Sequence, residues 1–300
     1  MRSPLRSGGN LMSAALRRGF LLLPVAFVGI FLVLPLAFMV VVSFWKPSML
    51  SFRPAFVLTN YGAFFSGTRL DVLWRTLLVS VEATLIALFI AYPIAYFLAR
   101  KASPFATRLV LLLFTVPFLV NYIIRTFSWT YLLGRTGPIN TAIIALGLSN
   151  GPVDWLLFGQ FSVLIGMVSS YMPFMIFPLW MSIAGIDRRL IEASWMLGAP
   201  PLRSFLGIIL PLSLPGVFAA LIFCFVGCFG EGAVPIILGG VGYQLIGTEI
   251  TSTLDVLNYP LAAAMSSVVT AALLALLTLW YLAFDLRSFL GKILSWRLAP

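Results

Sequence analysis

The sequence contains no histidine, and only 9% of its 300 residues are charged. Without histidine there is no histidine ligand for zinc, no histidine general base and no Ser-His-Asp triad. A soluble domain carries about 25% charged residues, so a soluble enzyme, a disordered chain and a coiled coil are all excluded. The alternation of polar and apolar residues that a transmembrane β-barrel requires is missing too.

Cysteine and lysine are also scarce. Cys224 and Cys228 lie four residues apart within an apolar run, which matches neither a CxxC redox pair nor a disulfide framework. The three lysines, Lys46, Lys101 and Lys292, are followed by Pro, Ala and Ile. A Walker A loop ends in Gly-Lys-Ser/Thr, so we expect no ATP hydrolysis by this chain, and we predict no catalytic residues, metal or cofactor.

Hydrophobic residues, in contrast, make up 61% of the chain and come in long unbroken runs. A helix needs about 20 mostly apolar residues to cross the hydrocarbon core of a membrane. We therefore predict an all-α integral membrane protein with six transmembrane helices. The predicted spans are Phe20–Phe44, Val72–Leu98, Leu109–Leu133, Phe161–Ala184, Phe205–Phe229 and Pro260–Phe284.

The distribution of basic residues predicts the orientation of these spans. One side of the membrane would hold 13 of the 19 lysines and arginines and the other would hold 6. Basic residues accumulate in cytoplasmic loops, so we place both termini in the cytoplasm and explain the net charge of +10 without nucleic acid. The predicted organisation is a cytoplasmic segment 1–19, a membrane domain 20–284 with a cytoplasmic loop 185–204, and a cytoplasmic tail 285–300.

The loop before the fifth span carries the most specific pattern. Apolar and small residues recur at helical spacing from Leu190 to Leu197. Gly198 then suits the end of a helix, and Pro200 and Pro201 prevent its continuation. We predict a short, rigid helix followed by a turn and a second helix from about Leu202.

This loop resembles the EAA motif of binding-protein-dependent ABC importer permeases. That motif reads Glu-Ala-Ala, three residues, Gly, nine residues, then Ile-x-Leu-Pro, and its short helix couples the permease to an ATPase subunit. The resemblance implies a type I importer permease whose ATPase-coupling residues lie at the matching positions. These are Glu192, Ala193, Ser194, Gly198 and Pro211, with Ser194 replacing the third motif residue.

Further segments resemble the spermidine/putrescine subfamily. They are residues 114–129 with a Pro-Phe, Asn and Ile-Arg run, the segment Gly137–Asn140, and Gly230–Gly240, where Gly232 replaces the usual aromatic residue. The resemblance implies polyamine import by alternating access in the bacterial inner membrane. It also implies three kinds of partner: two copies of an ABC ATPase, a second permease in a heterodimer, and a periplasmic solute-binding protein.

Two alternatives stay open. The solute of such a permease would instead be ferric iron, an amino-acid-like compound or a phosphonate, since related permeases share parts of the pattern. An ATP-independent channel or secondary transporter is the other alternative, although the motif spacing and the lack of an inverted repeat argue against it.

Acidic and aromatic residues supply candidates for the substrate pathway. Glu82 falls well inside the second span, where an unpaired carboxylate is costly, so it faces either a pathway or a packing partner. Glu231 opens the acidic outer loop of residues 230–259, and Arg125 is close enough in the predicted topology to pair with it. Aromatic candidates would line the path of an amine or belong to the interfacial belt. The full candidate set is Glu82, Glu231, Tyr122, Trp129, Glu249 and Asp255.

Overall fold

The computed structural model describes residues 24–47 and 52–283, and this part of the chain is almost entirely helical. Two antiparallel strands of two residues each, β1 (Lys46–Pro47) and β2 (Phe52–Arg53), are its only sheet. The predicted all-α class is confirmed. The predicted segment 1–19, the tail 285–300 and the first residues of the first span lie outside the described residues.

The chain divides into two compact units. The first combines Met1–Gly67 with Thr253–Thr270. In it, the Asn60 amide donates hydrogen bonds of 2.8 and 2.9 Å to the carbonyl oxygens of Ser43 and Trp45. Its elements are η1 (Gly29–Val33), α2 (Leu34–Ser43), β1, β2, α3 (Thr59–Phe65), the end of α13 (Ile246–Asp255) and the start of α14 (Tyr259–Ala283).

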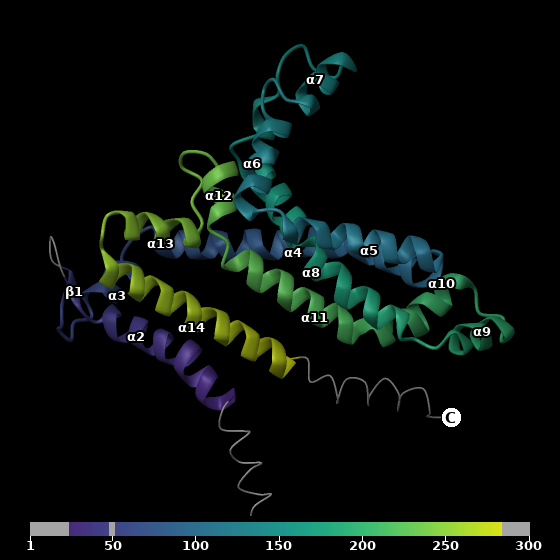
Figure 1. Ribbon diagram of the computed structural model, residues 1–300, viewed down its shortest axis with the longest axis horizontal. Coiled ribbons are helices and arrows are strands. Elements are labelled where there is room, and N and C mark those ends of the chain that lie inside the picture. The colour runs from purple at the N-terminus through teal and green to yellow at the C-terminus, as the bar shows by residue number, and fades with distance from the viewer. Residues whose placement is uncertain (1–23, 48–51, 284–300) are drawn as a thin grey trace, which may run out of the picture. The chain divides into compact units, whose positions relative to one another are not determined.

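The second unit, Thr68–Ser252 with Ala271–Pro300, holds all the elements that follow (Figure 1). They are α4 (Arg69–Arg100), α5 (Pro104–Leu119), α6 (Tyr122–Leu133), α7 (Pro138–Ala145), η2 (Asp154–Leu156), α8 (Gln160–Ala184), α9 (Arg188–Met196), α10 (Pro201–Ser204), η3 (Phe205–Ile209), α11 (Leu210–Phe229), α12 (Ala233–Leu238), the first part of α13 and the last part of α14.

Three long helices, α4, α8 and α11, pack side by side and form the core of this unit (Figure 1). Along α4, alanine recurs every fourth residue on the buried face, at Ala83, Ala87, Ala91 and Ala95, and all four are fully buried. Small residues let helix backbones approach closely within a membrane. The spacing of these alanines therefore explains how closely α4 packs against α8 and α11.

Contacts at both ends of α4 fix its direction relative to α8. Arg100, its last residue, donates hydrogen bonds of 2.7 and 2.8 Å to the carbonyl oxygens of Ile183 and Ile186 at the end of α8. Nearer its start, the Glu82 carboxylate accepts a 2.6 Å hydrogen bond from Gln160, the first residue of α8. The two helices therefore run parallel.

Because α4 and α8 are parallel, the chain between them must return across the membrane. The two helices that do so, α5 and α6, are separated by Val120 and Asn121, and the chain bends by 101° there. The prediction of a span at Leu109–Leu133 is right in place but wrong in assuming one continuous helix. With the bent pair counted once, the described residues contain the six spans that were predicted.

Proline explains two irregular turns at the starts of long helices. Pro35 and Pro211 each follow a π-helical turn, η1 and η3 respectively. A proline has no N–H to donate to the carbonyl four residues earlier, and a wider turn accommodates the interrupted ladder. The π-turn η3 thus lies directly between the loop and α11.

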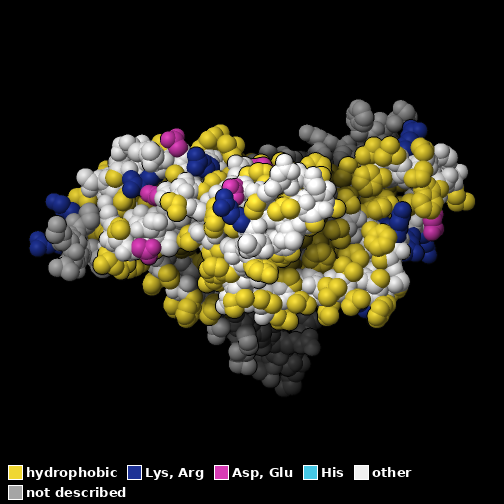
Figure 2. Space-filling model, turned by 90° about the horizontal axis from the view of Figure 1, so that it is seen from above, with side chains coloured by type: hydrophobic (Ala, Val, Ile, Leu, Met, Phe, Trp, Pro, Cys, Tyr) yellow, Lys and Arg dark blue, Asp and Glu magenta, His cyan; other side chains and the backbone are white. Residues whose placement is uncertain are grey.

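Hydrophobic side chains cover most of the face seen in Figure 2, and charged side chains form small groups on it. Large side chains such as Phe31 and Phe89 are 67% and 77% exposed. Such a surface is expected where lipid or another protein replaces water.

Candidate functional site

The loop singled out by the sequence folds as a helix, a tight turn and a second helix. Helix α9 begins after Asp187, whose carboxylate accepts a 2.9 Å hydrogen bond from the Arg189 amide as an N-cap. It ends before Gly198, whose φ of +76° is the left-handed conformation that glycine adopts without strain. Helix α10 then starts at Pro201. The predicted helix, glycine turn and proline stop are confirmed.

A pair of serines joins the two helices of this loop. The hydroxyls of Ser194 and Ser204 lie 2.7 Å apart, and Ser194 also donates a 2.7 Å bond to the Ile191 carbonyl. Ser204 is buried and donates toward the carbonyl oxygen of Pro200. The residue by which this loop departs from the motif is therefore the one that fastens α9 to α10.

The other residues of the motif are placed differently. Glu192 and Ala193 are exposed on α9, and neither makes a side-chain hydrogen bond with the described residues. Pro211 is half-buried at the start of α11, directly after η3. The loop thus has an exposed surface on α9, and at its other end it continues into the membrane-spanning helix α11.

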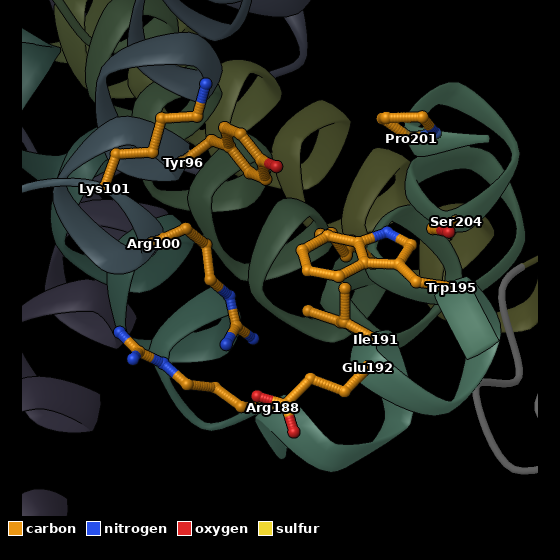
Figure 3. A pocket seen from close by; sticks show the side chains of 10 residues that line it. Tyr96, Arg100, Lys101, Arg188, Ile191, Glu192, Trp195, Pro201 and Ser204 are labelled. Atoms are coloured by element: carbon orange, nitrogen blue, oxygen red, sulfur yellow. The ribbon is translucent and has the colours of Figure 1, made fainter. Parts of the chain in front are cut away.

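A cavity of about 430 Å³ lies between the end of α4 and this loop, and sequence reasoning missed it (Figure 3). Its basic side chains come from the end of α4 and from α9, which are nearly a hundred residues apart in the sequence. No local sequence pattern therefore predicts the cavity. In Figure 3 the Arg100 guanidinium lies between Arg188 and the Trp195 ring. The lining consists of Tyr96, Arg100, Lys101, Arg188, Ile191, Glu192, Trp195, Pro201, Ser204 and Ile209.

Of the pathway candidates, Glu231 is the most enclosed, with a 5% exposed surface. One carboxylate oxygen accepts hydrogen bonds from the Tyr122 and Tyr171 hydroxyls, the latter at 2.8 Å. The other oxygen accepts from the backbone amides of Ala233 and Val234 at 2.9 and 3.2 Å. Glu231 therefore joins α6, α8 and the start of α12 through four donors.

The pair between Arg125 and Glu231 that the predicted topology allowed is not formed. Arg125 donates a 2.9 Å hydrogen bond to the Pro117 carbonyl, and its guanidinium carbon lies 5.3 Å from the centre of the Tyr122 ring. The break between α5 and α6 frees a carbonyl near the end of α5, and Arg125 takes it in place of the carboxylate.

Arg125 also lines a second cavity, of about 560 Å³, at the break between α5 and α6. Aromatic rings form much of its wall, with Phe118 and Phe174 edge to face at 5.3 Å. Its other lining residues are Pro117, Leu119, Val120, Asn121, Tyr122, Ser170 and Tyr171. Of the predicted pathway residues, Tyr122 is the one that lines either of these two cavities.

Glu82 lies well inside α4, as predicted. It is exposed on α4, and its hydrogen bond to Gln160 puts it level with the first residue of α8. From Glu82 to Arg100 the helix rises about 27 Å, close to the thickness of the hydrocarbon core.

The remaining three candidates occupy separate places. Trp129 on α6 donates a 3.0 Å hydrogen bond from its indole to the Ser169 hydroxyl of α8. Glu249 on α13 forms an ion pair with Arg69 of α4 at 3.3 Å. The loop of residues 230–259 has no lysine or arginine, so its basic partner comes from α4. Asp255 is exposed and belongs to the other compact unit.

The described residues hold no cluster of three or more histidine, cysteine or acidic side chains of the kind that binds a metal ion. Cys224 and Cys228 are both buried on α11 as free thiols. The linings of the two cavities offer hydrogen-bonding groups, charged groups and aromatic faces.

Comparison with known proteins places these features in a family. Residues 83–289 match the family described as the inner membrane component of binding-protein-dependent transport systems. The chain is 35% identical over 232 residues to the spermidine/putrescine transport system permease protein PotB of Haemophilus influenzae, covering 76% of this chain and 80% of that protein.

Two further similarities agree with the first. The inner membrane ABC transporter permease protein YdcU of Escherichia coli is 31% identical over 252 residues, covering 79% of this chain and 78% of that protein. A chain in the crystal structure of a bacterial alginate ABC transporter, bound to a periplasmic protein carrying an alginate pentasaccharide, shares the fold with a TM-score of 0.76. That match has 17% identity and covers 93% of this chain and 97% of the other.

Proposed function

Because this chain belongs to the family of inner membrane components of binding-protein-dependent ABC importers, we propose that it carries a polyamine, spermidine or putrescine, across the membrane. Family membership makes the chain the multi-pass permease and not the ATPase. The observation that carries the choice of solute is the 35% identity to a spermidine/putrescine permease over three quarters of the chain.

In the proposed mechanism, α9 receives the motion of the ATPase. Glu192 and Ala193 offer an exposed surface to that subunit, Gly198 sets the turn, and Ser194 and Pro211 connect the loop to α10 and α11. Closure of the ATPases on ATP displaces this loop, and the spans change between inward-open and outward-open states.

The proposed partners follow from the same premise. They are two ABC ATPase subunits, a second permease that forms a heterodimer with this chain, and a periplasmic solute-binding protein. The exposed apolar faces of the long helices support a protein neighbour within the membrane, as well as lipid.

Aromatic and acidic groups support passage of an organic cation. The cavity at the α5–α6 break presents the rings of Tyr122, Tyr171, Phe118 and Phe174, which attract ammonium groups through their faces. Glu231 lies behind two of these rings and places a carboxylate there. Glu82, Trp129, Glu249 and Asp255 remain further proposed contacts along the route.

Arg125 favours a second candidate, a solute with an anionic group such as a phosphonate. Its guanidinium lines the same cavity and its Nε is buried without a hydrogen-bond partner among the described residues. A polyamine passes this position only if Arg125 stays on Pro117 and Tyr122, as it does here.

The test is uptake by the intact importer in proteoliposomes, with labelled spermidine and putrescine presented on its binding protein. We expect uptake that depends on ATP, and about ten-fold slower uptake with Glu82→Gln and with Glu231→Gln, while the affinity of the binding protein is unchanged. Tyr171→Phe is the matched control for Glu231, because it removes one of the four hydrogen bonds but keeps the charge. Uptake of a phosphonate or of ferric iron, with polyamines ignored, contradicts the polyamine proposal and leaves the family assignment intact.

A further inference from the structure

The cavity beside α9 gathers basic groups that the proposed transport cycle does not use. Arg100, Lys101 and Arg188 line it together with a single carboxylate, that of Glu192. The ion pairs among the described residues, Arg69–Glu249 and Arg135–Asp154, involve none of these side chains. Three cations and one carboxylate give the cavity a net positive charge, which attracts an anion.

The hydrogen-bonding capacity of these groups is also incompletely used. One guanidinium nitrogen of Arg100 donates hydrogen bonds to two carbonyl oxygens, while its Nε is buried without a hydrogen-bond partner among the described residues. Guanidinium groups bind phosphate oxygens in a planar, often bidentate arrangement. A phosphate in the cavity would supply acceptors to both arginines.

The apolar part of the lining indicates where that phosphate comes from. Tyr96 lies one turn before the end of the α4 span, and Trp195 faces it from α9 across the cavity (Figure 3). Tyrosine and tryptophan favour the level of lipid headgroups. Phe97 and Leu202, which adjoin lining residues in the sequence, are 54% and 68% exposed and offer apolar surface for acyl chains.

We propose that this cavity binds the phosphate headgroup of an anionic phospholipid from the adjacent leaflet, between α4 and α9. The lipid would occupy one stripe of α9, formed by Arg188, Ile191 and Trp195. The end of the same helix, with Met196 and Leu197 about nine-tenths exposed, lies outside the lining and stays available to a protein partner. Bound lipid would thus adjoin Glu192, at the edge of the surface proposed for the ATPase, and leave Ala193 outside the cavity.

The test compares lipid retention by the intact importer, purified through a tag on this chain. The complex is delipidated, titrated with phosphatidylglycerol or phosphatidylcholine, and examined by native mass spectrometry. The variants are Lys101→Gln with Arg188→Gln, and as a matched control Arg108→Gln, which removes an exposed basic residue of α5 outside the cavity. Arg100 is left intact because it holds the α8–α9 turn.

We expect the wild-type complex and the Arg108 variant to retain phosphatidylglycerol in preference to phosphatidylcholine. The double variant should bind phosphatidylglycerol about thirty-fold more weakly, as the loss of two surface cations predicts. Equal retention of both lipids by the wild type overturns the proposal, and so does displacement of the lipid by inorganic phosphate at millimolar concentration. Another outcome is that the double variant loses the ATPase subunit whichever lipid is added. That result would mean that the cavity binds an acidic side chain of the ATPase, and it too would overturn the lipid proposal.

Discussion

The hydroxyl oxygens of Ser194 on α9 and Ser204 on α10 lie 2.7 Å apart, across the turn that carries Gly198. The serine at the third motif position therefore has a structural partner ten residues later. An alanine at this motif position could not form such a hydrogen bond. The Ser194–Ser204 contact between α9 and α10 is therefore a feature of this chain and not of the motif.

Replacing Ser194 with alanine should loosen the loop without unfolding it. A hydrogen bond of this kind contributes about 1 kcal/mol, and Ser204 retains its contact with the Pro200 carbonyl. Hydrogen exchange of the amides of residues 190–200 in the purified complex should accelerate about five-fold. Ser204→Ala should give the same acceleration, and the double variant no more than either one; additive effects would mean that the two hydroxyls act separately.

Replacing Gly198 with valine should impair coupling through the backbone alone. A side chain at this position meets no atom within 4 Å, but a φ of +76° costs an L-residue about 1–2 kcal/mol. We expect ATPase activity that no longer responds to the loaded binding protein. Gly198→Asn is the control, since asparagine tolerates this conformation better, and an equally damaging Asn variant would exclude the backbone explanation.

Replacing Gly216 with alanine should destabilise the packing of α8 against α11. The added carbon would lie 2.3 Å from Cβ of Ser182 and 2.7 Å from the Pro178 carbonyl oxygen, so backbone must move. Overpacking of this kind costs about 3 kcal/mol, visible as a lower unfolding temperature in detergent. Gly185→Ala, where the nearest atom is 3.4 Å away, should leave that temperature unchanged.

Labelling with a membrane-impermeant thiol reagent should test the topology. The native cysteines, Cys224 and Cys228, are buried and give little background. Asn150→Cys, between α7 and α8, should react in intact cells, whereas Ser103→Cys, between α4 and α5, should react only after permeabilisation. The reverse pattern would invert the predicted orientation and separate α9 from any cytoplasmic ATPase.

The all-helical class, the positions of the spans and the helix–turn–helix of the loop follow from local sequence. Hydrophobic run length, Gly198 and the two prolines each act within a few residues of where they stand. The break at Asn121 was not predicted, because the residues on both sides of it are together apolar enough to form one membrane span. Its signal was present in Pro117, Asn121 and Arg125 together, which interrupt an otherwise lipid-compatible run.

Long-range pairing accounts for what the sequence missed at the candidate sites. Glu231 has four donors from three helices, and Glu249 has Arg69 from a helix 180 residues earlier. The tyrosine donors to Glu231 and the arginine partner of Glu249 have no recognisable spacing, whereas the amides of Ala233 and Val234 lie two and three residues after Glu231. The alanine repeat on α4 was a detectable signal, because four alanines at intervals of four mark the face of closest helix approach.

The parallel pair α4 and α8 is tied at two levels, by Glu82 with Gln160 and by Arg100 with the turn after α8. Two hydrogen-bonded contacts about 27 Å apart along one axis oppose sliding of one helix along the other, so we expect the pair to move together as a rigid beam. Helix α11, by contrast, joins α9 through the π-turn η3, whose weaker hydrogen-bond ladder bends more readily. A force applied at α9 would accordingly rotate the beam as a whole, while α11 flexes at η3, close to Pro211.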